Sequence, residues 1–384
     1  MRSTLMTADE PPAALILAAG ESRRFWPLSA NQHKSLFRLA GASLLERTIR
    51  SLIHAGVRDI VIVQSPRSLY SASGDAVLPS DCLPAEYGDA RLAFVEQPEP
   101  AGQGDAIIRA AHLLGESFFV VQPENINAGD VVIELARAAA PGDVAVVAGQ
   151  QRADFSLYAV IEHSGNRLTG ITEKPGSASS ARPLCSTGVY LFGQSFVSHL
   201  AEFEPDPISI VLAIDQLGKA GKASVVARSH EFLPLKYPGH LWAYARYLGL
   251  APSPAAMSAA VLGAAAMPGA AAMPGRPADG DGSLAVLGGC IVSEHCTVGD
   301  DVSLHNAILA PGVVIGSGTE IANGGKWRDL DAVVIGEGAT IGKNVTIAPR
   351  VRIGVGATIA SGLTVERDVA DMTTVELMAD LAPS

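Results

Sequence analysis

Several features are scarce or missing in this sequence, and each of them excludes a class of protein. Basic residues are fewer than acidic residues, and the resulting net charge of -11 argues against a nucleic-acid or membrane-surface binder. The four cysteines lack C-x-x-C spacing, so Cys82, Cys185, Cys290 and Cys296 are typical of ordinary thiols in a reducing compartment. Neither a signal-peptide segment nor an apolar run long enough to span a membrane is found. We therefore expect a cytoplasmic protein without a membrane or nucleic-acid partner.

One stretch near the N-terminus has the pattern of a phosphate-binding turn. An apolar run from Ala13 to Ala19 meets Gly20, a short polar turn carries Arg23 and Arg24, and Lys34 follows. A buried strand that ends in Gly is where an open α/β sheet binds phosphates. Gly lets the backbone approach a ligand closely, and guanidinium and ammonium groups supply countercharge. In an acidic chain, such a local concentration of cations is the more informative.

The chain up to residue 250 alternates between helical and strand patterns. Apolar residues at helical spacing occur over 44–55 and 208–219, and a helix is expected over 103–114. Buried strands are expected over 13–19, 59–64, 91–95, 117–122, 143–148, 157–162 and 186–192. This alternation predicts an α/β fold with a mixed, mostly parallel sheet.

The first stretch resembles the opening motif of sugar-1-phosphate nucleotidyltransferases, L-A-A-G-x-G-T-R-x-x-P-L-T followed by P-K. The matching residues are Leu17, Ala18, Ala19, Gly20, Arg24, Pro27, Leu28 and Lys34. Ser22 stands in place of the second Gly, Arg23 in place of the Thr, and His33 in place of the Pro before Lys. The resemblance implies a Rossmann-like domain with Arg24 at the β/γ phosphates and Lys34 at the α-phosphate as catalytic residues. It also implies that the nucleotide contacts Leu17, Ala19, Gly20, Glu21, Ser22 and Arg23. For Arg23 the alternative is a side chain that points to solvent.

A second segment, residues 97–106, resembles the family pattern Q-x-x-x-x-G-T-A-D-A. The resemblance implies that Gln97, Gly102 and Gln103 line the pocket of the nucleobase, and an amide suits that role because it can both donate and accept. The alternative is a plain loop that leads into a helix, with Asp105 near the cap.

A third set of motifs implies the sugar side of the site. Glu173 and Lys174 match the family's E-K-P, with Glu173 accepting from sugar hydroxyls and Lys174, a third catalytic residue, contacting the sugar phosphate. Ala159 replaces a sugar-facing Gly, and Thr187 lies on a strand that resembles x-x-G-I-Y-x-F. The extra methyl of Ala159 narrows the predicted sugar site on that side, which favours an unusual sugar or a cyclitol phosphate as the substrate. The alternative for Glu173 and Lys174 is a surface turn that Pro175 ends.

The metal positions depart from the family. The family holds Mg²⁺ with two Asp residues, and here Glu124 stands at the first position and Pro234 at the second. Glu can ligate Mg²⁺ through a carboxylate oxygen, although its extra methylene moves that oxygen. The resemblance therefore implies Mg²⁺ as cofactor with Glu124 as its remaining protein ligand.

The C-terminal part has a period of six. Aliphatic residues recur at this interval from Val286 and in an uninterrupted final series, Ile335, Ile341, Ile347, Ile353, Ile359 and Val365. This resembles the left-handed parallel β-helix of hexapeptide-repeat proteins, whose flat faces pack as trimers or dimers of trimers. We expect a disordered tail 1–12, the nucleotidyltransferase domain 13–250, an Ala/Pro/Gly linker 251–283, the β-helix 284–370, and a tail or short helix 371–384.

Three functions from different classes fit these patterns. The first is an enzyme that joins an NTP and a sugar-1-phosphate into an NDP-sugar and pyrophosphate, as a homo-oligomer through the β-helix. The second is an NDP-sugar-binding regulator of weak or absent activity, which the two altered metal positions favour. The third is an acyltransferase in the β-helix, for which only His295 and His305 could act as base in that domain.

Overall fold

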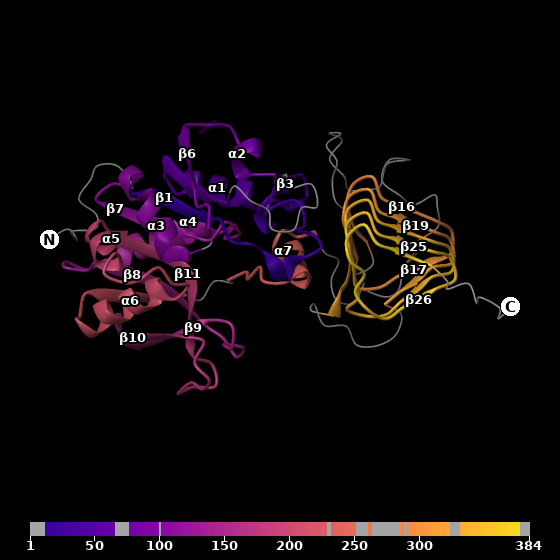
Figure 1. The fold of residues 1–384 in the computed structure, drawn as a ribbon. Helices are drawn as coiled ribbons and strands as arrows, with labels where there is room; N and C mark the ends of the chain where they lie inside the picture. The colour runs from indigo at the N-terminus through magenta and orange to yellow at the C-terminus, as the bar shows by residue number, and fades with distance from the viewer. Residues whose placement is uncertain are drawn as a thin grey trace. The chain divides into compact units, whose positions relative to one another are not determined.

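The computed structural model describes residues 12–65, 77–99, 101–228, 232–250, 260–262, 285–287, 290–322 and 331–376 (Figure 1). The chain divides into two compact units. The first unit comprises Met1–Glu21 and Leu44–Phe232, and the second comprises Ser22–Ser43 and Leu233–Ser384. The segment 22–43, which carries most of the first motif, thus belongs to the same unit as the C-terminal repeats.

A ten-stranded mixed sheet forms the centre of the first unit, in the order β5-β6-β4-β1-β7-β11-β8-β12-β10-β9. Strands β6, β4, β1 and β7 are parallel to one another, and β8 is parallel to β12; the other neighbours are antiparallel. The expected parallel character therefore holds chiefly for the strands around the first motif. The bounds are β1 (Ala13–Ala18), β4 (Asp59–Gln64), β5 (Glu86–Tyr87), β6 (Ala90–Glu96), β7 (Ser117–Val121), β8 (Ala145–Gln151), β9 (Ala159–Ser164), β10 (Arg167–Glu173), β11 (Leu184–Gly193) and β12 (Ala223–Ala227).

Helices cover both faces of this sheet. Leu15 and Leu17 of β1 join the apolar core that α3, α5 and α6 complete, whereas Ile16 is buried but lies outside that core. This is the alternation expected of a strand that is covered on both sides. The helices are α1 (Leu44–His54), α2 (Pro79–Cys82), α3 (Gln103–Ala110), the 3-10 turn η3 (Ala111–Leu113), α4 (Ala128–Ala138), α5 (Ser195–Leu200) and α6 (Ser209–Lys219).

The second unit begins with short elements that precede and follow the segment Leu44–Phe232 in sequence. These are η1 (Arg23–Phe25), η2 (Lys34–Leu36), the hairpin β2 (Arg38–Leu39) and β3 (Ala42–Ser43), and later η4 (Pro238–His240) and α7 (Leu241–Tyr247). Phe25 is buried and packs edge-to-face on Phe37, with ring centroids 6.3 Å apart. This aromatic pair fixes the start of the segment 22–43 to its end.

Short strands then form three stacks, the architecture of a β-helix (Figure 1). The first stack is β13 (Ala260–Leu262), β17 (Val302–Leu304), β20 (Glu320–Ile321), β23 (Thr346–Ile347) and β26 (Thr364–Val365). The second is β14 (Ala285–Leu287), β15 (Cys290–Val292), β18 (Ala307–Leu309), β21 (Val333–Ile335) and β24 (Arg352–Ile353). The third is β16 (Thr297–Val298), β19 (Val314–Ile315), β22 (Thr340–Ile341), β25 (Thr358–Ile359) and β27 (Thr374–Val375).

The period of six is confirmed by this packing. The predicted aliphatic residues from Val292 to Val365 lie in one buried core inside the coils. Strand pairing extends past residue 370, because β27 pairs with β25. The side chain of Val286, the tail 1–11, most of the linker 251–283 and residues 323–330 between β20 and β21 lie outside the described residues.

Two expectations from composition can be compared with the structure. No disulfide joins any of the four cysteines, and burial raises the pKa of the Cys290 thiol to about 12. Among the described residues, no helix is long and apolar enough to cross a membrane.

Candidate functional site

The first motif begins at the carboxyl end of β1. This strand is buried and pairs in parallel with β4 on one side and β7 on the other. Gly20 follows it as an exposed residue. The carboxyl ends of parallel strands are the edge at which α/β sheets bind ligands, so the structure places Gly20 where the sequence predicts it.

Ser22 adopts a conformation that normally requires glycine. Its φ of 54° lies in the left-handed region, at the position where the resembled motif has its second Gly. A side chain there carries a steric cost. Hydrogen bonds offset that cost: the Ser22 hydroxyl accepts from the backbone N–H of Lys34 at 3.3 Å, and its carbonyl accepts from Phe25 N at 2.8 Å. Ser22 thereby joins the turn that carries Arg24 to the turn that carries Lys34.

Two cations of this segment, Arg24 and Lys34, lie against one later stretch of the second unit. The Arg24 guanidinium lies 5.8 Å from the centroid of the Tyr237 ring. Lys34 Nζ donates to the carbonyl of Leu235 at 2.8 Å. Between them, Arg24 and Lys34 therefore contact the stretch that also contains Pro234, where the family has its second Asp. No sequence pattern predicted the roles of Tyr237 and of the Leu235 carbonyl, because both depend on a contact across about 200 residues.

His33 caps the turn η2 in its neutral form. Its Nδ1 accepts from the backbone N–H of Ser35 at 3.2 Å. Burial, assisted by the neighbouring Lys34 ammonium, lowers the pKa of His33 from 6.5 to about 3. Both effects disfavour the imidazolium, which has no lone pair on Nδ1 with which to accept.

Acid is expected to destabilise the fold through His33. Because the folded-state pKa of about 3 lies below the unfolded value of 6.5, the unfolded chain binds the proton first. The contribution is complete above pH 6.5 and is lost as the pH falls toward 3. From pH 7 to 5 we expect a loss of about 1–2 kcal/mol of unfolding free energy. Urea unfolding of the wild type and of His33→Asn, which keeps a capping side chain, measures it; an equal loss in both would contradict the assignment.

Both amide hydrogens of Gln97 are used in hydrogen bonds within the protein, so they are not available to read a base. Gln97 is buried, and its amide nitrogen donates to the Gly102 carbonyl at 2.9 Å and to Asp105 Oδ2 at 2.8 Å. Both partners are acceptors, so the orientation of the amide is chemically determined. Only its oxygen remains for a ligand. Asp105 also pairs with Arg109 at 2.7 Å, which accounts for it without a cap role.

Gly102 and Gln103 open helix α3. Gly102 has a φ of +95°, and a Cβ there would lie 2.7 Å from the carbonyl oxygen of Asp206. The position is thus restricted to glycine by conformation and by space. Gln103, half-buried, makes no hydrogen bond through its side chain with any part of the chain that the structure describes. Of the three predicted base-pocket residues, Gln103 has the side chain best able to bind a ligand.

A rigid turn at the end of β7 presents Glu124. The side-chain oxygen of Asn125 accepts from Gln122 N at 3.0 Å, and the carbonyl of Pro123 accepts from Thr48 Oγ1 at 3.0 Å. Glu124 is buried, with 7% of its surface exposed. The Asn125 side-chain oxygen is already used within the turn, so Glu124 has the side chain of this turn that best suits a metal.

The residues present are compatible with a Mg²⁺ ion that is largely held by substrate. Within the described ranges, no three His, Cys, Asp or Glu side chains gather into a metal-binding cluster. Mg²⁺ commonly keeps several waters and is bound through one or two carboxylates together with substrate phosphates. A single buried carboxylate at the carboxyl end of β7 is sufficient for that kind of binding.

Glu173 and Lys174 form a local ion pair at the end of β10. Lys174 Nζ lies 2.8 Å from Glu173 Oε1, and Lys174 N donates to the Tyr158 carbonyl at 3.1 Å. Lys174 has a φ of 42°, a left-handed value that is costly for a residue with a side chain. Such strain is found more often at functional positions than elsewhere. The Lys174 side chain, which carries the ammonium, is 52% exposed.

Ala159 and Thr187 are more enclosed than their predicted sugar-facing role suggests. Ala159 lies opposite Glu173 in the β9–β10 ladder and belongs to the main apolar core. Thr187 is buried in an irregularity of β11, where its hydroxyl donates to the Ala148 carbonyl at 3.2 Å. Their sugar contacts remain a prediction.

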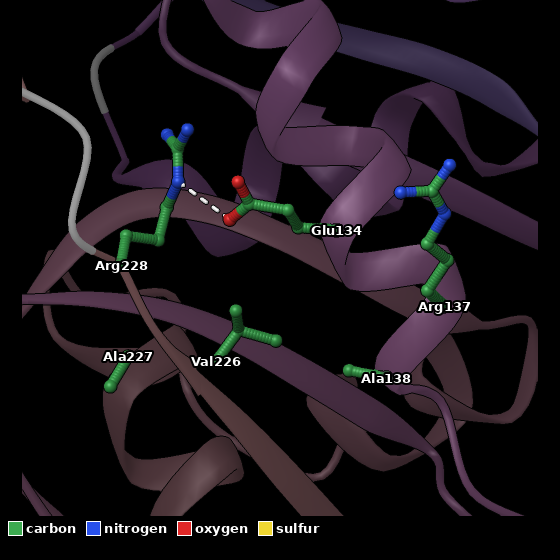
Figure 2. A pocket seen from close by; sticks show the side chains of 6 residues that line it. All are labelled: Glu134, Arg137, Ala138, Val226, Ala227 and Arg228. Carbon is green, nitrogen blue, oxygen red and sulfur yellow. Dashed lines mark hydrogen bonds and ion pairs between the residues drawn. The ribbon is translucent and has the colours of Figure 1, made fainter.

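A pocket of about 450 Å³ lies elsewhere in the first unit, between α4 and the end of β12. Figure 2 shows its lining side chains, with Arg228 Nε bonded to Glu134 Oε2 at 2.9 Å and Arg137 further along the same helix. None of the motif residues lines it. The pocket therefore does not bear on the predicted substrate site.

The two histidines of the β-helix lie in its turns. His305 is bonded through Nε2 to Ser303 Oγ at 2.9 Å, and His295 is exposed with a φ of 59°. The bond to Ser303 is local, because the two residues lie two positions apart in the same coil. These contacts provide no support for an acyltransferase base.

Comparisons with known proteins place these motifs in a family context. The family described as Nucleotidyl transferase matches residues 13–225, and the bacterial transferase hexapeptide, in six repeats, matches residues 332–367. A glucose-1-phosphate thymidylyltransferase of Xanthomonas campestris is 26% identical over 199 residues, covering 50% of this chain and 64% of that protein. This chain thus spans somewhat less than two thirds of the length of that relative.

Two further proteins, one curated relative and one solved structure, are similar to this chain. A UTP–glucose-1-phosphate uridylyltransferase of Bacillus subtilis is 26% identical over 211 residues, covering 49% of this chain and 71% of that protein. A Bacillus anthracis structure solved in complex with sucrose superposes with a TM-score of 0.52 at 18% identity, covering 61% of this chain and 94% of that one. The structural likeness concerns the fold.

Proposed function

Because this chain belongs to the nucleotidyl transferase family, we propose that it transfers a nucleotidyl group from an NTP to a sugar-1-phosphate. The observation that carries the proposal is the anchored pair of turns at Ser22, which holds Arg24 and Lys34 in one segment after the Gly20 turn. Two cations that follow a buried parallel strand in sequence suit a triphosphate. The relatives named for glucose-1-phosphate and for thymidylyl or uridylyl transfer make glucose-1-phosphate with dTTP or UTP the first substrates to test.

The reaction needs positioning and neutralisation of charge more than covalent chemistry. An oxygen of the sugar phosphate attacks the α-phosphorus in line, the new P–O bond forms, and the bond to the β-phosphate oxygen breaks. Pyrophosphate leaves with that electron pair. Lys34 would neutralise charge on the α-phosphate, and Arg24 would stabilise the departing pyrophosphate.

The sugar phosphate would be held by the ion pair at the end of β10. Lys174 would contact its phosphate, and Glu173 would accept hydrogen bonds from the sugar ring. Lys174 Nζ and Glu173 Oε1 lie 2.8 Å apart, so the ion pair holds the two side chains together before substrate binds. Glu124 would hold a bound Mg²⁺, whose charge would help to stabilise the negative charge of the phosphates.

Pyrophosphate release by the purified full chain with Mg²⁺ tests this function. The assay crosses the common NTPs with hexose-1-phosphates and cyclitol phosphates, and we expect turnover with one pyrimidine nucleotide and one sugar phosphate. If no pair releases pyrophosphate but an NDP-sugar raises the melting temperature of the protein, this result would contradict catalysis. It would favour the regulatory alternative, which the loss of the second Asp at Pro234 supports.

The hexapeptide coils are proposed to carry self-association. Their stacked strands leave exposed Val314 on an outer face, and repeat stacks bury such faces against further copies. A trimer or an assembly of dimers remains our proposal for this chain.

A further inference from the structure

The last coils of the β-helix contact the turn that carries Arg24. Arg352 Nη1 donates to the backbone carbonyls of Arg24 at 3.4 Å and of Trp26 at 3.3 Å. The indole N–H of Trp26 donates to the carboxylate of Asp371, with distances of 3.1 and 3.3 Å to its two oxygens. All four residues belong to the second unit. These contacts join positions more than 320 residues apart in sequence.

Both coil residues are held by their own surroundings. Asp371 Oδ1 also accepts from Val355 N at 2.8 Å, and the backbone N–H of Arg352 donates to Asp368 Oδ1 at 2.8 Å. A Cβ at Gly354 would collide with the backbone nitrogen of Asp371, so these coils pack as closely as glycine allows. Arg352 and Asp371 therefore approach the turn from a rigid base.

The contacts are of a kind that fixes backbone rather than side chain. A guanidinium that bonds two carbonyls of one turn restrains its peptide planes, and a bond to an ionised carboxylate is stronger than a neutral one. Within the turn, Phe25 is buried and packs against Phe37. The Arg24 side chain itself stays exposed. The turn is thus restrained at its backbone while its guanidinium remains available.

We propose that Arg352 and Asp371 are positioning residues for the transfer reaction: they hold the turn 22–26 so that Arg24 meets the NTP phosphates. This inference rests on the proposed function. It gives the β-helix a part in the catalytic site, in addition to self-association. Neither residue touches substrate in this proposal, and both act through the backbone of the turn.

Arg350 provides a matched control. It lies two residues before Arg352, and its side chain pairs with Asp331 at 2.6 Å and makes no hydrogen bond to the turn 22–26, all of whose residues the structure describes. Arg350→Ala removes the same type of side chain from the same coil. Arg352→Lys keeps the charge and one donor group, so we expect it to recover part of the activity.

The kinetic test compares these variants with the best substrate pair. We expect Arg352→Ala to lower kcat/KM for the NTP about 10-fold, with the KM of the sugar phosphate unchanged and the melting temperature close to wild type. Arg350→Ala should stay within about twofold of wild type. If Arg352→Ala fails to fold, Asp371→Asn replaces it, since this variant keeps an oxygen for Val355 N and weakens the bond to Trp26.

A second readout is independent of turnover. Hydrogen–deuterium exchange of the full chain should show faster exchange over residues 22–30 in Arg352→Ala than in Arg350→Ala. If the wild type has no activity with any pair, the proposed function fails while this comparison still tests the contact. Equal exchange in the two variants overturns the proposal, as does faster exchange with unaltered kinetics. A kinetic loss without faster exchange also overturns it, because Arg352 would then act through its charge.

Discussion

Arg24→Ala is expected to lower kcat/KM by about 100- to 1000-fold, the largest effect of any substitution we consider. The departing pyrophosphate gains charge in the transition state, and a fixed guanidinium stabilises that charge more than the ground state. The side chain is exposed and lies over Tyr237 without an ion pair to any described carboxylate, so truncation should leave the fold intact.

Steady-state pyrophosphate release measures this effect. Arg38→Ala is the control, because Arg38 lies in the hairpin that ends the same segment and bonds the carbonyl of Gly41. It should alter kcat/KM by less than about twofold. Retention of more than a third of wild-type activity in Arg24→Ala would remove Arg24 from the site.

Glu124→Gln should reduce kcat by about 100-fold or more at saturating Mg²⁺. Gln keeps the size of the side chain and removes the charge that a Mg²⁺ ligand needs. Because Pro234 has no side-chain oxygen, no second protein carboxylate at that position can compensate. The Mg²⁺ concentration for half-maximal rate should rise at least about 10-fold, and chelation by EDTA should abolish wild-type activity.

Two comparisons give this result its meaning. Glu86→Gln changes an exposed carboxyl of the edge strand β5 and should leave the Mg²⁺ dependence as it is. Glu124→Asp introduces the residue type of the resembled motif, and it should keep far more activity than Glu124→Gln. A Mg²⁺ dependence that is the same in wild type and Glu124→Gln would show that the ion is held by the nucleotide alone.

Pro234 departs from the family's second metal-binding Asp, and the structure places positive charges near this stretch. Lys34 bonds the Leu235 carbonyl and Arg24 lies over Tyr237, so two cations adjoin the stretch from which the second Asp is missing. A positive charge there can take over part of the role of a metal in neutralising phosphate. The sequence revealed the substitution, whereas the neighbouring cations became evident from tertiary contacts.

The local patterns predicted much of the architecture. A period of six with one aliphatic residue per turn predicted the coils from Val292 to Val365, because each hexapeptide repeats the same short-range geometry. Helix α1 and strands β1 and β4 followed from apolar spacing in the same way. The prediction of a mostly parallel sheet was less complete, since strand direction depends on partners distant in sequence.

The site itself was decided partly by sequence and partly by the fold. The resemblance to family motifs predicted Arg24, Lys34 and Lys174 as site residues, and these assignments stay predictions. Only the tertiary structure showed that Gln97 uses its amide hydrogens within the protein and that Arg352 restrains the turn of Arg24. Periodicity and turn chemistry are local properties of the chain, whereas these bonds exist only after packing has brought remote residues together.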